Sequence, residues 1–225
     1  MTSKIGSCEK RSRGRPKSFD REVAVRAAMR LFWERGYEGS SFDDLTAAMG
    51  INASSFRNTF KSKEALYREA TDAYVAMAGE WFARKLREGE DVRTAFAHLF
   101  EEAAAQYTRD DLPSGCMISL AGAHAPESLA PLKDMMAAHR ASAERAMAER
   151  LKQGQKDGQI PPDANIHALA AFFNALFRGM AVQARDGATR SRLAEIANVA
   201  MQAFPAASAK RVAAGAKSKR RKHRG

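Results

Sequence analysis

The sequence has few of the features that mark fibrous, secreted or membrane-embedded proteins. Its 225 residues include 15 glycines, 7 prolines and 8% aromatic residues, which excludes collagen-like and low-complexity chains. The two cysteines, Cys8 and Cys116, are too few for a disulfide framework and lack zinc-ligand spacing. The uncharged run in the most apolar region of the chain, residues 164–177, is too short to span a bilayer. The basic N-terminus lacks the apolar run of a signal peptide. We therefore expect no membrane association and a cytoplasmic location.

Positive charge is concentrated at the two ends of the chain. The formal net charge is +11, and residues 1–20 contain six Lys and Arg against two acidic residues, whereas residues 206–225 contain eight against none. Basic tails of this kind favour a polyanionic partner, because each neutralised phosphate releases condensed counterions. Nucleic acid is the preferred partner on this evidence. A membrane surface is the main rival, and tails that only keep the protein soluble are the third interpretation.

Helical periodicity dominates the sequence. Apolar residues recur at three- and four-residue spacing, and no segment alternates as a strand would. We predict an all-α protein of about nine helices, with several boundaries at capping residues such as Asp20, Ser41, Asn52 and Ser62. The expected ranges are 20–35, 42–49, 53–60, 63–88, 91–108, 116–123, 127–155, 163–186 and 189–204.

Two short helices joined by Gly50-Ile51-Asn52 carry the clearest functional pattern. A glycine-containing turn of three to four residues between such helices is typical of a helix-turn-helix, although a plain αα-hairpin with a polar outer face fits the same spacing. The residues expected to form a small core here are Leu45, Met49, Ile51, Phe56 and Phe60. The residues left on the exposed face are Ala53, Ser54, Ser55, Arg57, Asn58 and Thr59. Their hydroxyls, amide and guanidinium suit phosphates and base edges in a major groove.

A longer stretch around this pair of helices matches a known pattern. It comprises residues 27–42, AAMRLFWERGYEGSSF, residues 43–51, DDLTAAMGI, and residues 60–66, FKSKEAL, in order and without gaps. Through them, residues 14–78 resemble the N-terminal domain of the TetR/AcrR family of bacterial one-component repressors. The resemblance implies a helix-turn-helix DNA-binding domain over 18–78 and a ligand-binding and dimerisation domain over 79–205. A basic arm, 1–17, and a disordered basic tail, 206–225, would flank them.

The resemblance also implies a set of DNA contacts. This chain departs from the family pattern at two places, residues 56–57 and residues 58–59. The family's lysine beside a backbone phosphate matches Lys63. The family usually has a Leu-Tyr pair where this chain has Phe56-Arg57, and a ring-bearing residue near Asn58-Thr59. Arg57 can replace the family tyrosine at a phosphate or bind a guanine. The predicted DNA-binding residues are Arg13, Arg15, Ser41, Ser54, Ser55, Arg57, Asn58, Thr59 and Lys63.

The segment Arg13-Gly14-Arg15-Pro16 is a second candidate DNA contact. This pattern is the core of AT-hook-like segments, in which glycine lets the backbone lie in a narrow minor groove and both arginines enter its negative potential. Four residues are a short motif, and a plain linker fits equally well.

The C-terminal region resembles the family's sensing domain more loosely, through Gly115-Cys116-Met117 and residues 179–185, GMAVQAR. The fold transfers through such a resemblance, but the ligand does not. The predicted pocket residues are Trp81, Phe82, Phe96, Phe100, Cys116, Met117, Leu120, His124 and Met136, for which ordinary core packing is the alternative. A soft metal could be bound by Cys116, Met117 and His124, and an oxidant could be sensed by Cys116. Because of the spacing of these residues, we expect no metal and no cofactor.

The last two predicted helices are apolar on more than one face, so one face is expected to pack against a partner. In the family this pair forms a four-helix dimer interface; burial within one subunit is the alternative. The predicted interface residues are Leu169, Phe173, Leu176, Phe177, Met180, Ile196, Ala200 and Phe204.

These patterns predict a homodimeric DNA-binding transcriptional regulator rather than an enzyme. The five histidines accompany no nucleophile elbow, and the chain has no phosphate-binding glycine loop. We expect repression from a palindromic double-stranded operator, relieved by an unknown small-molecule inducer. The alternative is a sequence-independent architectural protein that coats DNA through its tails, which would protect no preferred site in a footprint.

Deletion of residues 206–225 tests the role of the basic tail. The deletion removes eight cations. If several of them contact phosphates, the slope of log affinity against log salt should flatten by about 0.9 for each phosphate that the shortened protein no longer neutralises. DNA-binding titrations over a range of salt concentrations measure this slope, and an unchanged slope would show that the tail is only solvated.

Overall fold

The computed structural model describes residues 19–89, 91–121 and 129–205. The predicted N-terminal arm, including Arg13 and Arg15, the predicted tail and His124 lie outside these residues. The described part contains nine α-helices, one short 3₁₀ helix and no strand. The helices are α1 (Arg21–Arg35), α2 (Phe42–Met49), α3 (Ala53–Phe60), α4 (Lys63–Arg87), α5 (Val92–Tyr107), α6 (Met117–Leu120), α7 (Ala130–Lys156), α8 (Ile166–Arg185), α9 (Arg190–Ala200) and η2 (Met201–Ala203).

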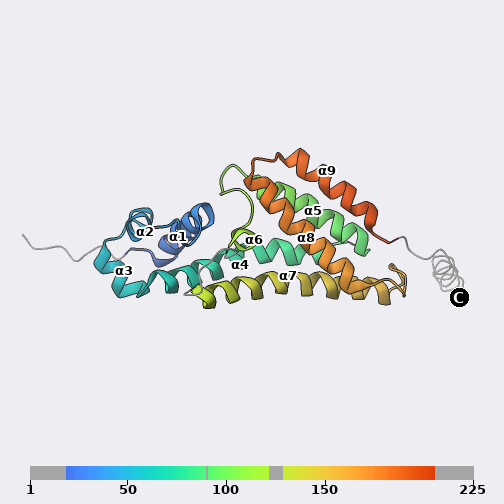
Figure 1. The fold of residues 1–225 in the computed structure, drawn as a ribbon, viewed down its shortest axis with the longest axis horizontal. Coiled ribbons are helices and arrows are strands. Elements are labelled where there is room, and N and C mark those ends of the chain that lie inside the picture. Colours follow the sequence, from blue (N-terminus) through green and yellow to red (C-terminus); the bar gives the residue numbers. More distant parts are fainter. Residues whose placement is uncertain (1–18, 90, 122–128, 206–225) are drawn as a thin grey trace, which may run out of the picture.

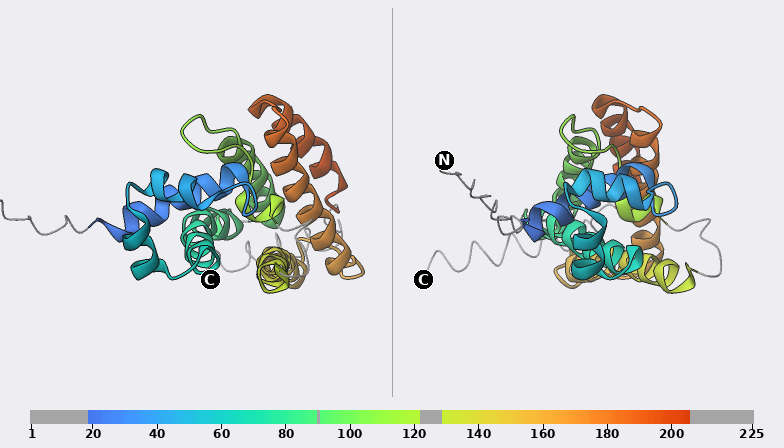
Figure 2. Two further views of the ribbon diagram at one scale, coloured as in Figure 1. Left: turned by 60° about the vertical axis from the view of Figure 1, so that its left-hand side comes forward. Right: turned by 90° about the vertical axis from the view of Figure 1, so that its left-hand side faces the viewer.

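The helices form an elongated arrangement. Figure 1 places α1, α2 and α3 at one end and α5, α8 and α9 at the other. The two longest helices, α4 and α7, pack against each other and run between the ends, while α1 lies across the first part of α4 (Figure 2). At 1.5 Å per residue, the 25 residues of α4 extend over about 37 Å. The boundary predicted near residue 78 therefore falls inside a continuous helix.

Side-chain caps set the starts of the first four helices, as their sequence predicts. Asp20 accepts hydrogen bonds from the backbone of Glu22 and Val23, and Ser41 forms a capping box with Asp44. Asn52 and Ser62 accept from Ser55 and Ala65 in the same way. Each cap satisfies a backbone N–H that the first turn of a helix leaves unpaired.

Several later boundaries differ from prediction. The short helix α6 spans Met117–Leu120 rather than 116–123, and α7 begins at Ala130 rather than 127. α8 begins at Ile166 rather than 163, because Asn165 provides the cap and the preceding turn is held by Gln155. The Gln155 amide donates to the carbonyls of Pro161, Pro162 and Ala164.

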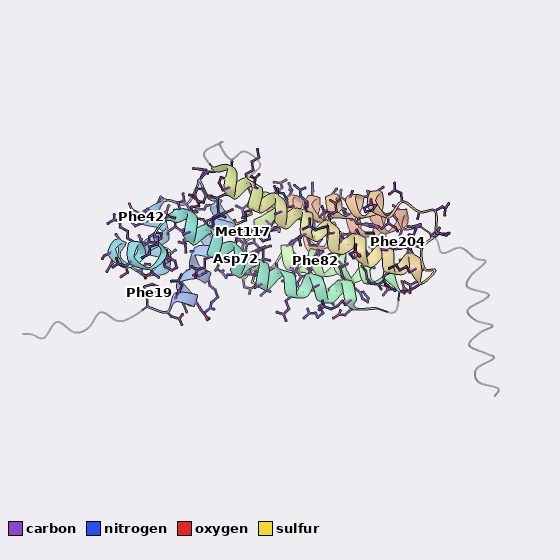
Figure 3. All side chains as sticks on the ribbon, turned by 90° about the horizontal axis from the view of Figure 1, so that it is seen from below. Phe19, Phe42, Asp72, Phe82, Met117 and Phe204 are labelled. Carbon is purple, nitrogen blue, oxygen red and sulfur yellow. The ribbon has the colours of Figure 1, made fainter. Side chains whose placement is uncertain are left out.

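A continuous hydrophobic core joins both ends of the molecule. It extends from the neighbourhood of Phe42 at one end to Phe204 at the other (Figure 3). At the far end, Phe96 lies 5.0 Å from Phe173 and 5.9 Å from Phe204 between ring centroids. None of the helices in the described ranges is long and apolar enough to cross a membrane.

Candidate nucleic-acid interface and interior cavity

The turn between α2 and α3 is held by its backbone. Gly50 adopts a left-handed conformation, φ 65° and ψ 30°, which glycine reaches without steric cost. The N–H groups of Gly50 and Ile51 donate to the carbonyls of Ala47 and Thr46. These bonds end α2 and direct the chain into α3, as in a helix-turn-helix.

Aromatic packing fixes the orientation of α3. Phe56 and Phe60 are buried beneath the helix, and Phe56 meets Phe42 edge-to-face at 4.8 Å. Leu45 and Met49 are also buried, whereas Ile51 is half-buried. The expected small core is therefore present, and it leaves one side of α3 facing solvent.

That solvent-facing side carries the polar residues that the sequence singled out. Ser54, Arg57 and Asn58 are exposed, and Ser55 and Thr59 are half-buried. The Arg57 guanidinium lies 5.7 Å from the centre of the Phe42 ring, which restrains the side chain beside the helix. The face thus presents hydroxyl, amide and guanidinium groups.

Two further predicted contacts, Lys63 and Ser41, are engaged within the protein. The Lys63 ammonium lies 4.4 Å above the Tyr37 ring, and partial burial lowers the pKa of Lys63, opposed by the charge of Glu38. The Ser41 hydroxyl donates to the Asp44 carboxylate at 2.6 Å, and this bond lowers the pKa of Asp44. Both residues border the helix-turn-helix, but each keeps an internal partner.

Two basic residues beside α3 are absent from the sequence predictions. Lys61 follows the last residue of α3 at a positive φ of 67°, and its ammonium donates to the Asn58 carbonyl at 2.9 Å. Arg21 makes a bidentate ion pair with Glu69 of α4 and lies 4.9 Å from the centre of the Phe60 ring. Lys61 is an exposed cation at the recognition face, whereas Arg21 ties α1, α3 and α4 together.

The helix-turn-helix region has no excess of positive charge. Residues 18–78 contain eight Lys and Arg and nine Asp and Glu. The region as a whole therefore supplies no net positive charge for non-specific attraction to DNA. Any DNA contact here depends on where a few cations are placed.

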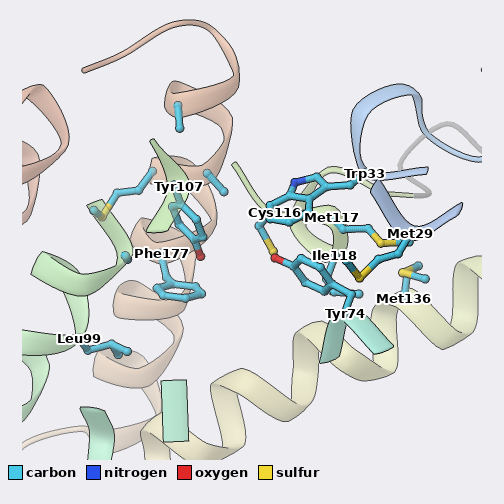
Figure 4. Close-up of a cluster of buried hydrophobic side chains, with 14 of the residues drawn as sticks. Met29, Trp33, Tyr74, Leu99, Tyr107, Cys116, Met117, Ile118, Met136 and Phe177 are labelled. Atoms are coloured by element: carbon cyan, nitrogen blue, oxygen red, sulfur yellow. The ribbon is translucent and has the colours of Figure 1, made fainter. Parts of the chain in front are cut away.

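The C-terminal end of α1 is attached to the rest of the molecule by two arginines. Arg185, the last residue of α8, donates to the carbonyls of Trp33 and Glu34, and Arg30 donates to the Asp111 carbonyl. A cation is favourable at the α1 carbonyls because they form the negative end of the helix dipole. Trp33 also packs edge-to-face against Tyr74 at 4.9 Å (Figure 4).

An interior cavity of about 300 Å³ opens between α4, α6, α7 and α8. This volume lies at the lower end of the range for small-molecule sites. Its wall is mostly apolar and includes Cys116 and Tyr107, which Figure 4 shows in the buried cluster between the two ends of the molecule. The structure thus combines an exposed polar helix at one end with a partly open cavity in the middle.

Two family models match the chain over most of its described length. Residues 24–70 match bacterial regulatory proteins of the tetR family, and residues 94–199 match the tetracyclin repressor-like C-terminal domain. The chain belongs to the TetR family.

Its relatives include named repressors. The HTH-type transcriptional repressor ComR of Escherichia coli K12 is 36% identical over 207 residues, covering 91% of this chain and 98% of ComR. The repressor BdcR of the same organism is 27% identical, covering 85% and 92%. A cysteine-substituted form of the TetR-family regulator CifR, solved with 26-base-pair operator DNA, is 36% identical with a TM-score of 0.82, covering 85% of this chain and all of that one.

Membership in the family establishes the general function. This TetR-family chain is a helix-turn-helix, DNA-binding transcriptional repressor. The resemblance inferred from the runs around Gly36 and Gly50 is confirmed, and so is the all-α class.

The predicted pocket residues divide into two groups. Trp81, Phe82 and Cys116 line the cavity. The other described residues do not line it, because they pack into the core around it: these are Phe96, Phe100, Met117 and Met136. The side chain of Leu120 is outside the described part. The polar residues of the wall, absent from the sequence predictions, include Tyr107, His139, Arg140, Asn174 and Arg178.

Cys116 has a structural role that sequence spacing did not reveal. Its sulfur accepts the Ser119 N–H at 3.4 Å and so caps α6, and the side chain is buried beside the Tyr74 hydroxyl. In the ranges that the structure describes, no three His, Cys, Asp or Glu side chains gather as metal ligands would.

Several predicted dimer contacts point inward instead. Phe173, Phe177 and Met180 are buried in the core of their own subunit, and Phe177 lines the cavity. Ala200 and Phe204 are buried as well, whereas Leu169, Leu176 and Ile196 are half-buried. Phe173, Phe177 and Met180 face the core that α8 shares with α5 and α7.

The opposite face of α8 carries small and apolar residues. It consists of Ala168, Ala171, Phe172, Ala175, Gly179 and Val182, all exposed and repeating at three- and four-residue spacing. Phe172 and Val182 are 45% and 42% exposed, which is unusual for large apolar side chains in a helix packed on a core. We call these six residues the α8 stripe.

Removing the cap of α3 should weaken the recognition helix without touching its exposed face. Asn52→Ala deletes the acceptor of the Ser55 N–H and is expected to lower the free energy of unfolding by about 1 kcal/mol. Asn58→Ala is the matched control, because its amide has no hydrogen bond within the described residues and its loss should change stability by less than about 0.5 kcal/mol. Denaturant titrations followed by circular dichroism compare the two, and equal losses would contradict the capping role.

Proposed function

We propose that this repressor binds a palindromic operator as a homodimer in the cytoplasm and releases it when a small molecule enters the interior cavity. The observation that carries the DNA part is the α3 face, whose polar groups are exposed while Phe56 and Phe60 anchor the helix beneath. Two such helices, one per subunit, would enter successive major grooves about 34–36 Å apart.

The contacts divide by chemistry into base-reading and phosphate-binding groups. Arg57 and Asn58 are exposed side chains of the kind that read guanine and adenine edges, with Ser54, Ser55 and Thr59 beside them. Lys63 and Ser41 border the helix and would approach phosphates, together with Lys61. Arg13 and Arg15 would reach an adjacent minor groove.

The α8 stripe is the proposed dimer contact. Alanine and glycine allow two helices to approach closely, and a Cβ placed on Gly179 meets no atom within 4 Å in one subunit. Phe172 and Val182 would lose their solvent exposure against a second copy. Ala175 is the central residue of this stripe.

The cavity is connected to α1 through packed side chains. Tyr74 and Cys116 line it, and Tyr74 packs on Trp33 of α1, whose terminal carbonyls are held by Arg185 of α8. A ligand that favours a different arrangement of α4 and α8 would change the spacing of the two recognition helices. It would release DNA to the extent that it binds that arrangement more tightly.

Substitution of Arg57 and Lys63 tests the proposed DNA contacts. Arg57→Ala should weaken binding by about 1–3 kcal/mol if its guanidinium is bidentate to guanine, and it should relax selectivity at one base pair. Lys63→Ala should weaken all sequences alike, because a phosphate contact carries no base information. Binding would be measured on a site selected by the wild-type protein from random DNA and on its scrambled version.

Arg145→Ala controls for lost charge, since Arg145 is exposed on α7, away from the helix-turn-helix. Unchanged affinity in both test variants would remove α3 from the interface. A footprint on the selected site separates a repressor from a coating protein, because only the repressor protects one short symmetric site.

Ala175→Arg tests the dimer contact. In the monomer, the introduced guanidinium would be exposed to solvent. In the proposed interface it would be buried without a partner, which costs several kcal/mol. The variant should remain helical, sediment as a monomer and lose most of its operator affinity. Ala137→Arg, at an exposed position of α7, should do none of this. A dimeric Ala175→Arg variant would place the interface elsewhere, and a monomer with full affinity would contradict the two-half-site model.

A further inference from the structure

The aromatic wall of the cavity suits a planar apolar body. Phe177 lies 5.3 Å from Phe82 and 6.0 Å from Trp81 between ring centroids, and Tyr107 lies 5.4 Å from Phe177 and 6.4 Å from Trp81. Aromatic side chains at such distances offer both faces and edges to another ring. The volume of about 300 Å³ accommodates a molecule the size of one or two rings.

Two deeply buried polar groups in this wall have no partner within the described part of the chain. They are the Tyr107 hydroxyl and Oδ1 of Asn174. Nδ2 of Asn174 donates to Glu144 at 3.0 Å, which leaves Oδ1 as an acceptor. Burial raises the pKa of Tyr107 well above its usual value, so its hydroxyl remains a donor. Buried polar groups are almost always paired, and an unpaired donor and acceptor in one wall indicate a ligand.

Three basic side chains lie in the same wall. His139, Arg140 and Arg178 line the cavity, and no Asp or Glu is among its described lining residues. Arg140 donates to the carbonyls of Ile118 and Ala121, whereas Arg178 has no ion pair within the described ranges. Burial lowers the pKa of Arg140, and the neighbouring charge of Arg178 lowers it further. Arg140 is half-buried, Arg178 is exposed, and neither forms an ion pair within the described ranges, so an anion between these two guanidiniums is favoured.

We propose that the cavity binds an apolar organic acid of one or two rings. Its carboxylate lies at Arg140 and Arg178, and its body lies among Trp81, Phe82 and Phe177. A polar substituent on the ring satisfies Tyr107 or Asn174. This assignment rests on the proposed role of the cavity as the inducer site, and it adds the chemical class of the inducer.

Binding of matched probes to the full chain tests the class. The probes are 1-naphthoate, its neutral analogue 1-naphthamide and its cationic analogue 1-naphthylmethylammonium, with 3-hydroxy-2-naphthoate to supply a ring hydroxyl. Calorimetry without DNA should give an affinity for the carboxylates at least about tenfold higher than for the amide, with the cation weakest. A tenfold difference is the size expected of one charge-assisted contact.

Two variants locate the site. Arg178→Gln should weaken carboxylate binding about tenfold and leave amide binding unchanged, whereas Arg145→Gln, away from the cavity wall, should change neither. Tyr107→Phe should weaken binding of the hydroxy acid while leaving the unliganded protein as stable as the wild type or more stable. That combination distinguishes a ligand contact from a structural one, because an unpaired hydroxyl stabilises nothing.

The outcomes separate this inference from the function on which it rests. Absence of carboxylate binding, preference for the amide or the cation, or indifference to Arg178→Gln would each overturn the organic-acid assignment. Release of DNA from the selected site would be measured separately by fluorescence anisotropy. Carboxylate binding at Arg178 without release would support the ligand class and contradict the inducer role of the cavity. If only a neutral probe released the DNA, the result would support the inducer role of the cavity and contradict the organic-acid assignment.

Discussion

One continuous helix, α4, forms part of both the DNA-binding end and the cavity wall, and the arrangement of the other helices depends on it. Its first turns bury Leu66 and Tyr67 against α1 and the recognition elements, whereas its later turns place Trp81 and Phe82 in the wall of the cavity. The backbone is continuous between them. In the proposed mechanism, a shift of α4 at the cavity would be transmitted to the DNA-binding end, because hydrogen-bonded helices move largely as rigid elements.

The parts of the fold that depend on local chemistry follow from the sequence. Asp20, Ser41, Asn52 and Ser62 cap helices within a few residues of themselves, so their spacing alone locates the starts of four elements. The beginning of α8 was misplaced because the turn before it is held by Gln155, through an amide whose target carbonyls no local pattern reveals. Long-range packing, rather than local propensity, decides such boundaries.

The side of a helix on which an apolar side chain lies was harder to predict from the sequence than the position of the helix itself. α8 has Phe173, Phe177 and Met180 on one side and mainly alanine and glycine, together with Phe172 and Val182, on the other. Because α8 is apolar on more than one face, we expected Phe173 and Phe177 to meet the partner. Both face inward, since bulky side chains fill the deep core between α5 and α7. Phe96 and Phe100 were predicted to line the pocket, but their rings pack on Phe173 instead. The polar wall residues were missed because they are scattered over three helices and converge only in space.

The two faces of α8 join the proposed activities in one rigid element. Asn174 and Phe177 face the cavity, Ala175 and Gly179 face outward on the α8 stripe, and Arg185 at its end holds the carbonyls of α1. A ligand that rotates or translates α8 to satisfy Asn174 would move the contact between subunits and the anchor of α1 together. Because residues 18–78 have no net positive charge, the helix-turn-helix domain itself supplies no diffuse attraction that would hold the operator while the recognition helices are displaced. In the proposed mechanism, a small change at the cavity would therefore be sufficient to release the operator.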